Sequence, residues 1–158
     1  KIPVLVFSID KDFLQLIDDK IQICLIKEGM KKVIHYNAHV LWEEYSLKAN
    51  QITHFKSLIG DSSDNIQGVP SIGPKTAIKL LNQFQNLDNL FNNLTQINDK
   101  IKAKLINYKR QIFFNLILVT IDTSIPSCLN YTQTKIKKVE PNLLRDFLQQ
   151  NKLKYQKI

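Results

Sequence analysis

Two pairs of aspartates have the spacing that best fits chemistry. Asp10 and Asp12 stand two residues apart directly after an apolar run, and Asp61 and Asp64 stand three apart after Gly60. Carboxylates at the C-terminal end of a parallel strand lie where open α/β sheets place their sites, and a three-residue step in a turn puts two side chains on one face. Mg²⁺ and Mn²⁺ prefer such oxygen ligands. Four carboxylates in two tight pairs repel one another unless a cation neutralises them. The pattern therefore predicts a metal-dependent site.

Each pair taken alone has a simpler explanation. Asp10 or Asp12 could cap a helix with an acidic first turn. Asp61 and Asp64 could belong to a turn with capping Asp and Ser side chains. It is the presence of both pairs in one chain that favours a cation site.

A second motif follows at once, over residues 66–79, and it is the most specific pattern in the chain. It reads hydrophobic-x-Gly-hydrophobic-Pro-x-Ile-Gly-x-Lys-Thr-Ala. Three of the chain's four glycines fall within fourteen residues here, which indicates demanding backbone geometry: Gly60, Gly68 and Gly73. A P-loop is excluded, because the order Gly-x4-Gly-Lys-Ser/Thr is absent.

This motif predicts a hairpin that holds phosphate. Pro74 suits the first turn of a helix, and the free amides at that helix start, near Gly73, Lys75 and Thr76, point at an anion. Lys75 and Lys79 lie one turn apart and add positive charge. Such a device holds a nucleic-acid backbone without reading bases. An ordinary helix–turn–helix in a bundle is the alternative.

A strand and several short elements must position the aspartates. Residues 1–9, KIPVLVFSI, form an apolar run rich in β-branched residues, which predicts a strand buried on both faces as in a parallel sheet. Such a strand needs neighbours, so we expect a further N-terminal portion. The remaining expected elements of the first part are a short helix over 12–18, strands over 21–26 and 31–35 around a turn at 27–29, a helix over 38–45 capped by Asn37, and a helix over 49–59.

After residue 59 the pattern is entirely helical. We expect helices over 75–84 and 87–93, then one long helix over about 100–121 capped by Asp99, an irregular stretch over 122–138 and a last helix over 141–150. The long helix carries an apolar stripe that indicates packing, not a cofactor site: Ile101, Leu105, Tyr108, Ile112, Leu116 and Val119.

Charge is unevenly divided along the chain. Residues 1–74 carry 8 Lys and Arg against 9 Asp and Glu, whereas residues 75–158 carry 14 against 5. A polyanion is the obvious partner for the positive second half, although a solvated lysine-rich surface gives the same count.

Cys24 and Cys128 have no metal-ligand spacing, which favours small core residues in a reducing compartment. We expect a soluble protein, because the longest apolar stretch, 112–121, is too short to span a bilayer.

Three segments together resemble a known family. They are Ser-Ile-Asp-Lys-Asp-Phe-Leu-Gln-Leu-Ile (8–17), Leu-Trp-Glu-Glu-Tyr (41–45) and the run from Leu58 to Leu81 that holds the second aspartate pair and the hairpin. In order and spacing they are similar to the bacterial-type 5′→3′ exonuclease, which is the 5′-nuclease domain of bacterial DNA polymerase I and its stand-alone relatives, kin to flap endonucleases. The likeness extends from about residue 4 to about residue 122, and the final 36 residues match poorly.

The resemblance implies a fold and three regions. The fold is α/β: the C-terminal part of a PIN-like, Rossmann-like parallel-sheet nuclease core, followed by a mainly helical helix–hairpin–helix (helix–three-turn–helix) subdomain. Residues 1–59 would be the remainder of the core, residues 60–122 the DNA-binding subdomain, and residues 123–158 a C-terminal extension packing back on the core.

The resemblance also implies residue roles. Asp10, Asp12, Asp61 and Asp64 match the family's second metal group and would hold one of two Mg²⁺ or Mn²⁺ ions, which lie about 3.5–4 Å apart in such sites. The positions that match the DNA-gripping hairpin are Gly68, Val69, Gly73, Lys75 and Thr76. Lys79, one turn after Lys75, is expected to add its charge to the DNA-binding residues. A K⁺ ion in the hairpin would meet the backbone carbonyls of Gln67, Val69 and Ile72. Ser71 stands where Gly is common in the family, and Gln67 where Pro is common. The acidic residues of the first metal group have no counterpart in these 158 residues.

The implied function is 5′→3′ exonuclease or 5′-flap endonuclease action on DNA in replication and repair, including removal of RNA primers or flaps. The expected partner is duplex or flapped DNA with a 5′ end. A fused polymerase domain or a separate polymerase is expected as a second partner. We expect the chain to be a monomer and to have no membrane partner. Its Asn-, Ile- and Lys-rich composition fits the cytoplasm (nucleoid) of a reduced bacterium, or an organelle such as a plastid. Two alternatives stay open: a non-catalytic, sequence-independent duplex-binding module, and a PIN-like RNA nuclease.

Overall fold

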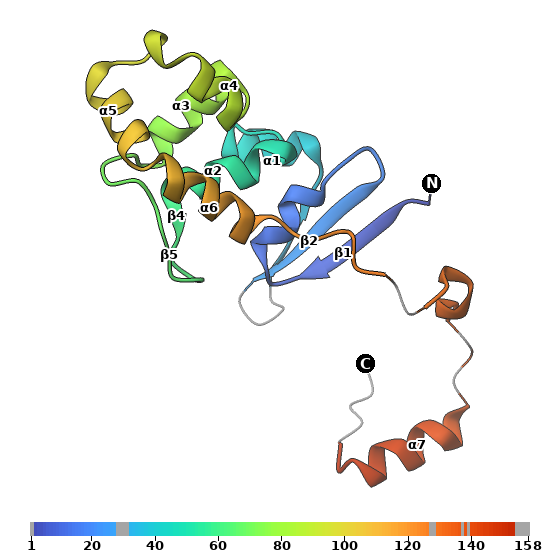
Figure 1. Ribbon diagram of the computed structural model, residues 1–158. Coiled ribbons are helices and arrows are strands. Elements are labelled where there is room, and N and C mark those ends of the chain that lie inside the picture. The colour runs from blue at the N-terminus through green and yellow to red at the C-terminus, as the bar shows by residue number, and fades with distance from the viewer. Residues whose placement is uncertain (1, 28–31, 127–128, 137, 139, 154–158) are drawn as a thin grey trace. The chain divides into compact units, whose positions relative to one another are not determined.

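The computed structural model describes residues 2–27, 32–126, 129–136, 138 and 140–153. The chain divides into two units, Lys1–Ile121 and Asp122–Ile158, and Figure 1 labels elements of each. The first unit holds the aspartates and the hairpin.

A three-stranded sheet forms one end of the first unit. Its order is β1 (Val4–Ser8), β2 (Ile21–Lys27), β3 (Lys32–Tyr36), with β1 parallel and β3 antiparallel to β2. The three predicted strands and the parallel pairing of the first are confirmed. The predicted turn at 27–29 lies largely outside the described residues.

Burial of the first strand was predicted wrongly. Val4, Leu5 and Phe7 are exposed, Phe7 by 63%, whereas the middle of β2 is buried on both faces. Among the described residues β1 lies at an edge of the sheet with β2 as its neighbour on one side. An edge strand keeps an unpaired side, and here its apolar side chains also stay largely uncovered.

Short helices connect the sheet to the rest of the unit. A 3₁₀ helix, Lys11–Leu16, follows β1, and α1 (Ala38–Tyr45) follows β3. Asn37 caps α1 as predicted, since its side-chain oxygen accepts the Val40 N–H at 2.9 Å. The predicted helix over 49–59 is a 3₁₀ turn, Ala49–Gln51, that continues into α2 (Ile52–Ile59).

The predicted long helix over 100–121 is wrong, because the structure has two helices there. They are α5 (Asp99–Asn107) and α6 (Lys109–Val119), separated by Tyr108 in a non-helical conformation (φ −103°, ψ 10°). The cap of α5 is Asn98, whose side chain accepts the Lys100 N–H, and not Asp99. Sequence on both sides of Tyr108 favours helix, so the break arises from tertiary packing: Tyr108 is half-buried against the core and α6 packs along α2.

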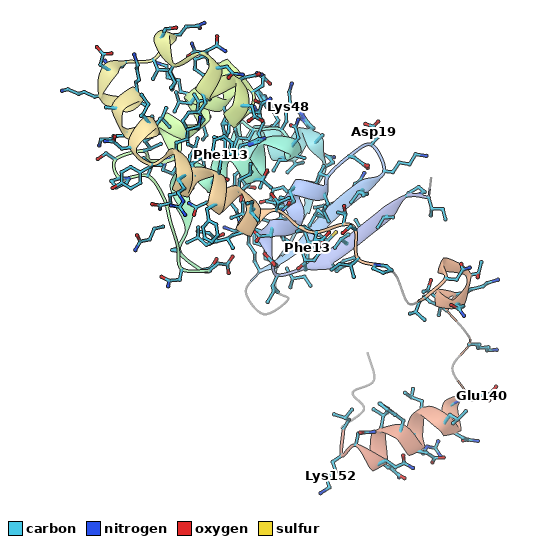
Figure 2. The ribbon with its side chains drawn as sticks, viewed as in Figure 1. Phe13, Asp19, Lys48, Phe113, Glu140 and Lys152 are labelled. Atoms are coloured by element: carbon cyan, nitrogen blue, oxygen red, sulfur yellow. The ribbon has the colours of Figure 1, made fainter. Side chains whose placement is uncertain are left out.

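The apolar stripe is confirmed as packing. Leu105 and Ile112 are fully buried and Val119 is 3% exposed. Leu105 and Ile112 pack in the unit's interior with buried residues of the helices α3 (Pro74–Phe84) and α4 (Leu87–Asn92), and Leu94 of the 3₁₀ turn Leu94–Gln96 packs against them. Figure 2 shows side chains filling this interior, with Phe113 among the helices and Phe13 beside the sheet.

The prediction of an entirely helical pattern after residue 59 was wrong. A two-stranded antiparallel pair, β4 (Gly60–Asp61) and β5 (Ile66–Gln67), lies between α2 and α3. Two residues a strand leave too short a pattern for the sequence to signal. This strand pair carries Asp61 at one end and leads into the hairpin at the other.

The second unit contains a short 3₁₀ helix, Tyr131–Thr134, and α7 (Pro141–Gln150). The predicted last helix is confirmed, and the described residues between 122 and 140 are irregular apart from that short helix. No helix among the described residues is long and apolar enough to cross a membrane. Cys24 is buried in β2, as expected of a core residue, and Cys128 lies outside the described residues.

Candidate metal centre and phosphate-binding hairpin

Three of the four predicted aspartates converge. Asp12 comes from the 3₁₀ helix after β1, Asp61 from β4, and Asp64 from the turn between β4 and β5. One carboxylate oxygen from each lies within 4.8 Å of the others. We call these three residues the aspartate cluster. Three carboxylates at this separation are a donor set that fits a hard divalent cation.

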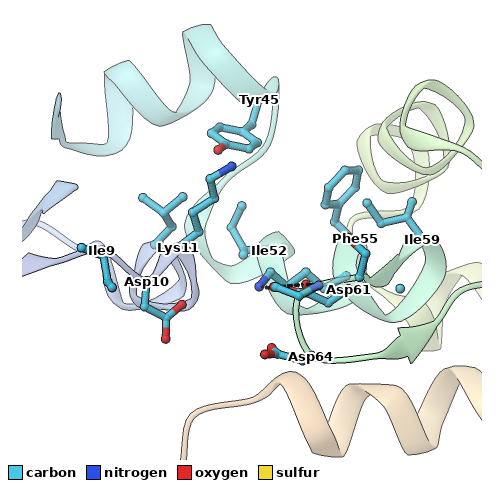
Figure 3. Close-up of a pocket in the computed structure, with 14 residues that line it drawn as sticks. Ile9, Asp10, Lys11, Tyr45, Ile52, Phe55, Ile59, Asp61 and Asp64 are labelled. Atoms are coloured by element: carbon cyan, nitrogen blue, oxygen red, sulfur yellow. Dashed lines mark hydrogen bonds and ion pairs between the residues drawn. The ribbon is translucent and has the colours of Figure 1, made fainter. Parts of the chain in front are cut away.

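Asp10 does not join the aspartate cluster. It caps the 3₁₀ helix, where its Oδ1 accepts the Asp12 N–H at 2.8 Å. Figure 3 shows its carboxylate apart from Asp61 and Asp64. The capping role was the simpler explanation for this residue, and it holds for Asp10 while Asp12 turns inward.

Lys56 is the residue of this site that the sequence analysis missed. Its Nζ forms ion pairs with Asp12 Oδ1 and with Asp61 Oδ2, the latter at 2.6 Å. The lysine side chain is only 15% exposed. A signal was available, because Lys56 is the one charged residue within the helix Ile52–Ile59 and stands five residues before Asp61.

These contacts set the charge state of Asp61. Burial alone would raise the pKa of the Asp61 carboxyl, but hydrogen bonds from Lys56 and Ser63 outweigh it and lower the pKa to about 2. Asp61 therefore stays ionised across the physiological range. A permanently ionised carboxylate is what a cation ligand requires.

The cluster borders an open cleft of about 680 Å³. Asp61, Asp64 and Lys56 line one part of it, and the aromatic side chains of Tyr45 and Phe55 line another (Figure 3). A charged group facing an apolar wall has fewer competing waters, so its interaction with a ligand is stronger than in bulk solvent.

Backbone packing determines the path of the hairpin. The Val69 N–H donates to the Leu58 carbonyl at 2.8 Å and the Ile72 N–H to the Val69 carbonyl at 3.0 Å. A Cβ on Gly68 would lie 2.2 Å from the carbonyl carbon and oxygen of Ile59. Gly60, with φ +79°, faces the same segment from the other side. Two of the three clustered glycines therefore let two backbones meet.

Gly73 has a different reason to be glycine. A Cβ there would meet nothing within 4 Å. Gly73 is the cap residue of α3 with Pro74 at the first helical position, and no side chain caps this helix. The amides at the helix start therefore lack intrahelical acceptors, and Gly73 leaves the space before them open. Lys75 and Thr76 lie on the same turn, and the anion site at these amides stays a prediction.

The predicted DNA-binding residues differ in which atoms they can offer. Lys75 and Lys79 are exposed and Thr76 is half-buried. Val69 is only 4% exposed, so its side chain anchors the hairpin and its backbone alone remains for a ligand. Ser71 takes a left-handed conformation with φ 66°, which gives a physical reason for glycine to be common at this position.

Side chains from α5 and α6 hold the hairpin's carbonyls. The Gln67 carbonyl accepts from Asn115 Nδ2 and from Gln111 Nε2, both at 2.8 Å. Lys104 Nζ lies 3.2 Å from the Pro70 carbonyl. Because Gln67 O already has two side-chain donors, it is a poorer K⁺ ligand than the prediction required. Val69 O accepts one backbone donor and retains capacity.

Asn115 was also missed as a site residue. It is 4% exposed, and its Nδ2 bridges the Ser57 carbonyl at 3.2 Å to the Gln67 carbonyl at 2.8 Å. Ser57 adjoins Lys56, so one amide connects the helix behind the aspartate cluster to the start of the hairpin. The signal was an asparagine on the buried stripe of an otherwise apolar segment.

Comparison with known proteins agrees with this geometry. A family model described as "5′-3′ exonuclease, C-terminal SAM fold" matches residues 47–142. DNA polymerase I of Bacillus subtilis is 43% identical over 124 residues, which are 78% of this chain and 14% of that protein. The 5′-3′ exonuclease of Mycoplasma genitalium is 32% identical over 155 residues, covering 97% of this chain and 53% of that protein. This chain thus spans about half the stand-alone relative and a small part of the polymerase.

Solved structures lead to the same conclusion. The bacteriophage T5 D15 flap endonuclease, in a complex with DNA and metal ions, superimposes with a TM-score of 0.65 at 26% identity, covering 74% of this chain and 42% of that one. The catalytic core of Rad2 shares the fold, with a TM-score of 0.55 at 20% identity over 91% of this chain and 50% of that chain. With the family model covering more than half of its residues, the chain belongs to the 5′-3′ exonuclease family.

Proposed function

We propose that this chain is the cation-binding and DNA-gripping part of a metal-dependent 5′→3′ exonuclease or 5′-flap endonuclease. One observation carries the proposal: the aspartate cluster, with its oxygens within 4.8 Å, includes Asp61 of β4, and β4 pairs with β5 at the start of the hairpin. Asp61 pairs with Ile66, and Gly60 with Gln67. A cut at a phosphodiester needs both a cation at the reacting phosphate and a grip on the neighbouring backbone.

Asp12, Asp61 and Asp64 are the proposed ligands for Mg²⁺ or Mn²⁺. Such a cation, when bound, would stabilise negative charge on the phosphate and lower the pKa of a bound water. Asp10 supports the site indirectly, because its carboxylate accepts the Asp12 N–H and so holds the turn from which Asp12 points inward. The predicted role of Asp10 as a ligand is thereby replaced by a positioning role.

The hairpin is proposed to hold duplex DNA by its phosphates. The open amides at Gly73, Lys75 and Thr76 and the charge of Lys79 supply contacts that do not depend on base sequence. The substrate would be duplex or flapped DNA with a free 5′ end, and the biological task the removal of RNA primers or flaps. The excess of Lys and Arg in residues 75–158 supports a polyanionic partner.

Further proposals concern assembly and setting. A fused polymerase domain or a separate polymerase would fill the gaps made by the 5′→3′ cut, and the chain would act as a monomer. K⁺ in the hairpin is proposed with the carbonyls of Val69 and Ile72 as ligands. The cytoplasm of a bacterium, at the nucleoid, is the proposed location, with a plastid as the alternative supported by the Asn-, Ile- and Lys-rich composition.

Alanine substitution tests the proposed site directly. Asp61→Ala and Asp64→Ala are each expected to abolish Mg²⁺-dependent cleavage of a 5′-labelled duplex while duplex binding persists, because the hairpin lies outside the cluster. Asp19→Ala, an exposed acidic residue in the loop before β2, is the matched control and should cleave normally. Cleavage retained by Asp61→Ala would refute the assignment.

A second candidate is a non-catalytic duplex-binding module. It is favoured by the missing counterparts of the family's first metal group within these 158 residues. Affinity would then be about 10⁻⁴–10⁻⁶ M and steeply salt-dependent. Cleavage by the 158-residue chain in Mg²⁺ would exclude this candidate, and salt-dependent binding without cleavage would support it.

A further inference from the structure

The starting point is the place that Lys56 takes inside the aspartate cluster. Its ammonium pairs with Asp12 and Asp61, which are the two half-buried carboxylates of the cluster, while Asp64 is exposed. Lysine is seldom this buried unless it is paired. One ammonium against three carboxylates leaves the cluster with a net negative charge, so part of the repulsion within it persists.

The ammonium and a divalent cation would use the same oxygens. Asp12 Oδ1 is buried from solvent and, within the part of the chain that the structure describes, has no hydrogen-bond donor apart from its ion pair with Lys56. Asp61 Oδ2 is likewise taken up by Lys56. A cation that binds these oxygens must therefore move the ammonium away.

Lys56 has the means to move. Its charge sits at the end of a flexible four-carbon stem, and the side chain lines the cleft of about 680 Å³. The ammonium can swing into that cleft and regain water, whereas the three carboxylates are held on separate elements. Displacement costs the ion pairs but exchanges one positive charge for two.

We propose that Lys56 is a tethered counter-ion that keeps the aspartate cluster stable before metal binds and that a divalent cation displaces, so that Lys56 sets the cation affinity. The inference rests on the proposed function, because it takes Asp12, Asp61 and Asp64 as cation ligands. The effect of Lys56 on cation affinity would then be opposite in sign to the effect of a residue that supports the site. A lysine that merely held the ligands in position would strengthen metal binding, whereas a tethered competitor weakens it.

Calorimetric titration with Mn²⁺ tests this sign in the 158-residue chain. Lys56→Met keeps an unbranched side chain only one atom shorter and removes the charge. It is expected to bind Mn²⁺ about tenfold more tightly than the unsubstituted chain, because the competing charge is gone. Its melting temperature in chelator should be lower, and the rise on adding Mn²⁺ larger. Lys56→Arg, which keeps a cation, and Lys100→Met, at an exposed lysine of α5, should stay near the unsubstituted values.

Two results would overturn the proposal, and they are distinguishable. If the unsubstituted chain binds Mn²⁺ and Lys56→Met binds it equally or more weakly, the competition is refuted and the proposed cation site survives. If neither binds Mn²⁺, and Asp61→Asn is indistinguishable from both, the proposed cation site itself fails.

If Lys56→Met does not fold, the proposal can be tested on the unsubstituted chain, which keeps the charge of Lys56. Lysine ε-methylene resonances are followed by NMR during a Mg²⁺ titration, with Lys56 assigned by the signal that Lys56→Arg lacks. The Lys56 resonance should shift toward the position of exposed lysines, with the same midpoint as Mg²⁺ binding. A Lys56 resonance that stays in place while Mg²⁺ binds would refute displacement.

Discussion

The aspartate cluster and the hairpin are adjacent but are stabilised by different forces. In the cluster, the ammonium of Lys56 forms ion pairs with two of the three carboxylates, those of Asp12 and Asp61. In the hairpin, backbone hydrogen bonds and close backbone contact determine the path, as Val69 N–H to Leu58 O and the Gly68–Ile59 approach show. Gly60, the first residue of β4, precedes Asp61 and pairs with Gln67, so it belongs to both regions.

This difference separates a region that responds to ions from one that is already formed. Opposed charges in a partly buried site respond strongly to a new cation, and removing one partner leaves an uncompensated charge. Neutral backbone hydrogen bonds and steric fit depend little on ionic strength. We therefore expect the hairpin to keep its shape whether or not the cluster holds a cation.

The largest effect is expected from Gly68→Ala. Its methyl group would lie 2.2 Å from the Ile59 backbone, and neither partner is the flexible end of a side chain. The backbone must shift, which should lower the free energy of unfolding by about 3 kcal/mol, measured by urea denaturation. Because Ile59 precedes Gly60 and Asp61, cation binding should fall as well.

Gly73→Ala is the control for this substitution, since its methyl group meets no atom within 4 Å. A Gly68→Ala chain as stable as Gly73→Ala would show that the two backbones are less closely packed than the structure indicates. It would also remove the steric half of the comparison between the two regions.

An intermediate effect is expected from Asn115→Leu, which tests how the two regions are connected. The substitution keeps the branched shape of the side chain at a somewhat larger volume, but it leaves the Ser57 carbonyl without its 3.2 Å donor and the Gln67 carbonyl with one side-chain donor fewer. Unfolding free energy should fall by about 2 kcal/mol, the cost of polar groups left short of partners in a buried setting. Duplex affinity should also fall, while Mn²⁺ affinity changes less.

Gln111→Leu is the matched control for Asn115→Leu. It removes a second donor to the same Gln67 carbonyl, but from a side chain in an exposed contact. Its effect on stability should be smaller, about 0.5–1 kcal/mol. Equal effects of the two substitutions would mean that the bridge to Ser57 adds nothing.

Local chemistry explains which parts of this architecture could be predicted from the sequence. The Asn37 cap, the Pro74 start of α3 and the last helix at Pro141 depend on residues within one turn, and all three were predicted correctly. The break at Tyr108 has no local signal, since neither Pro nor Gly is present, and it depends on how α6 packs along α2.

The same distinction applies to the candidate site. Spacing identified four aspartates, but which of Asp10 and Asp12 turns inward depends on the backbone of the 3₁₀ helix, where Asp10 accepts the Asp12 N–H. Lys56 and Asn115 act through contacts with residues up to 58 positions away in the chain. A polar residue on a buried stripe signals that such a contact exists, but the stripe does not identify the partner.

The smallest effect is expected from Gly73→Ala on DNA binding, and it tests the open face of the hairpin. The backbone at Gly73 (φ −90°, ψ 178°) suits any residue and the methyl group meets nothing, so unfolding free energy should change by less than about 0.5 kcal/mol. If the space before the α3 amides receives a phosphate, the methyl group should weaken duplex binding about fivefold, near 1 kcal/mol. Fluorescence anisotropy at constant salt measures this change.

The salt dependence of the same titration separates contact from charge. Gly73→Ala removes no charge, so the slope of log affinity against log salt should stay constant, whereas Lys75→Gln should reduce it by about one. Unchanged affinity in Gly73→Ala would mean that phosphate does not approach the helix start, and the grip would then come from the lysines alone. In that case the hairpin would respond to ions as the aspartate cluster does, and the two regions would differ in how they are built but not in how they bind.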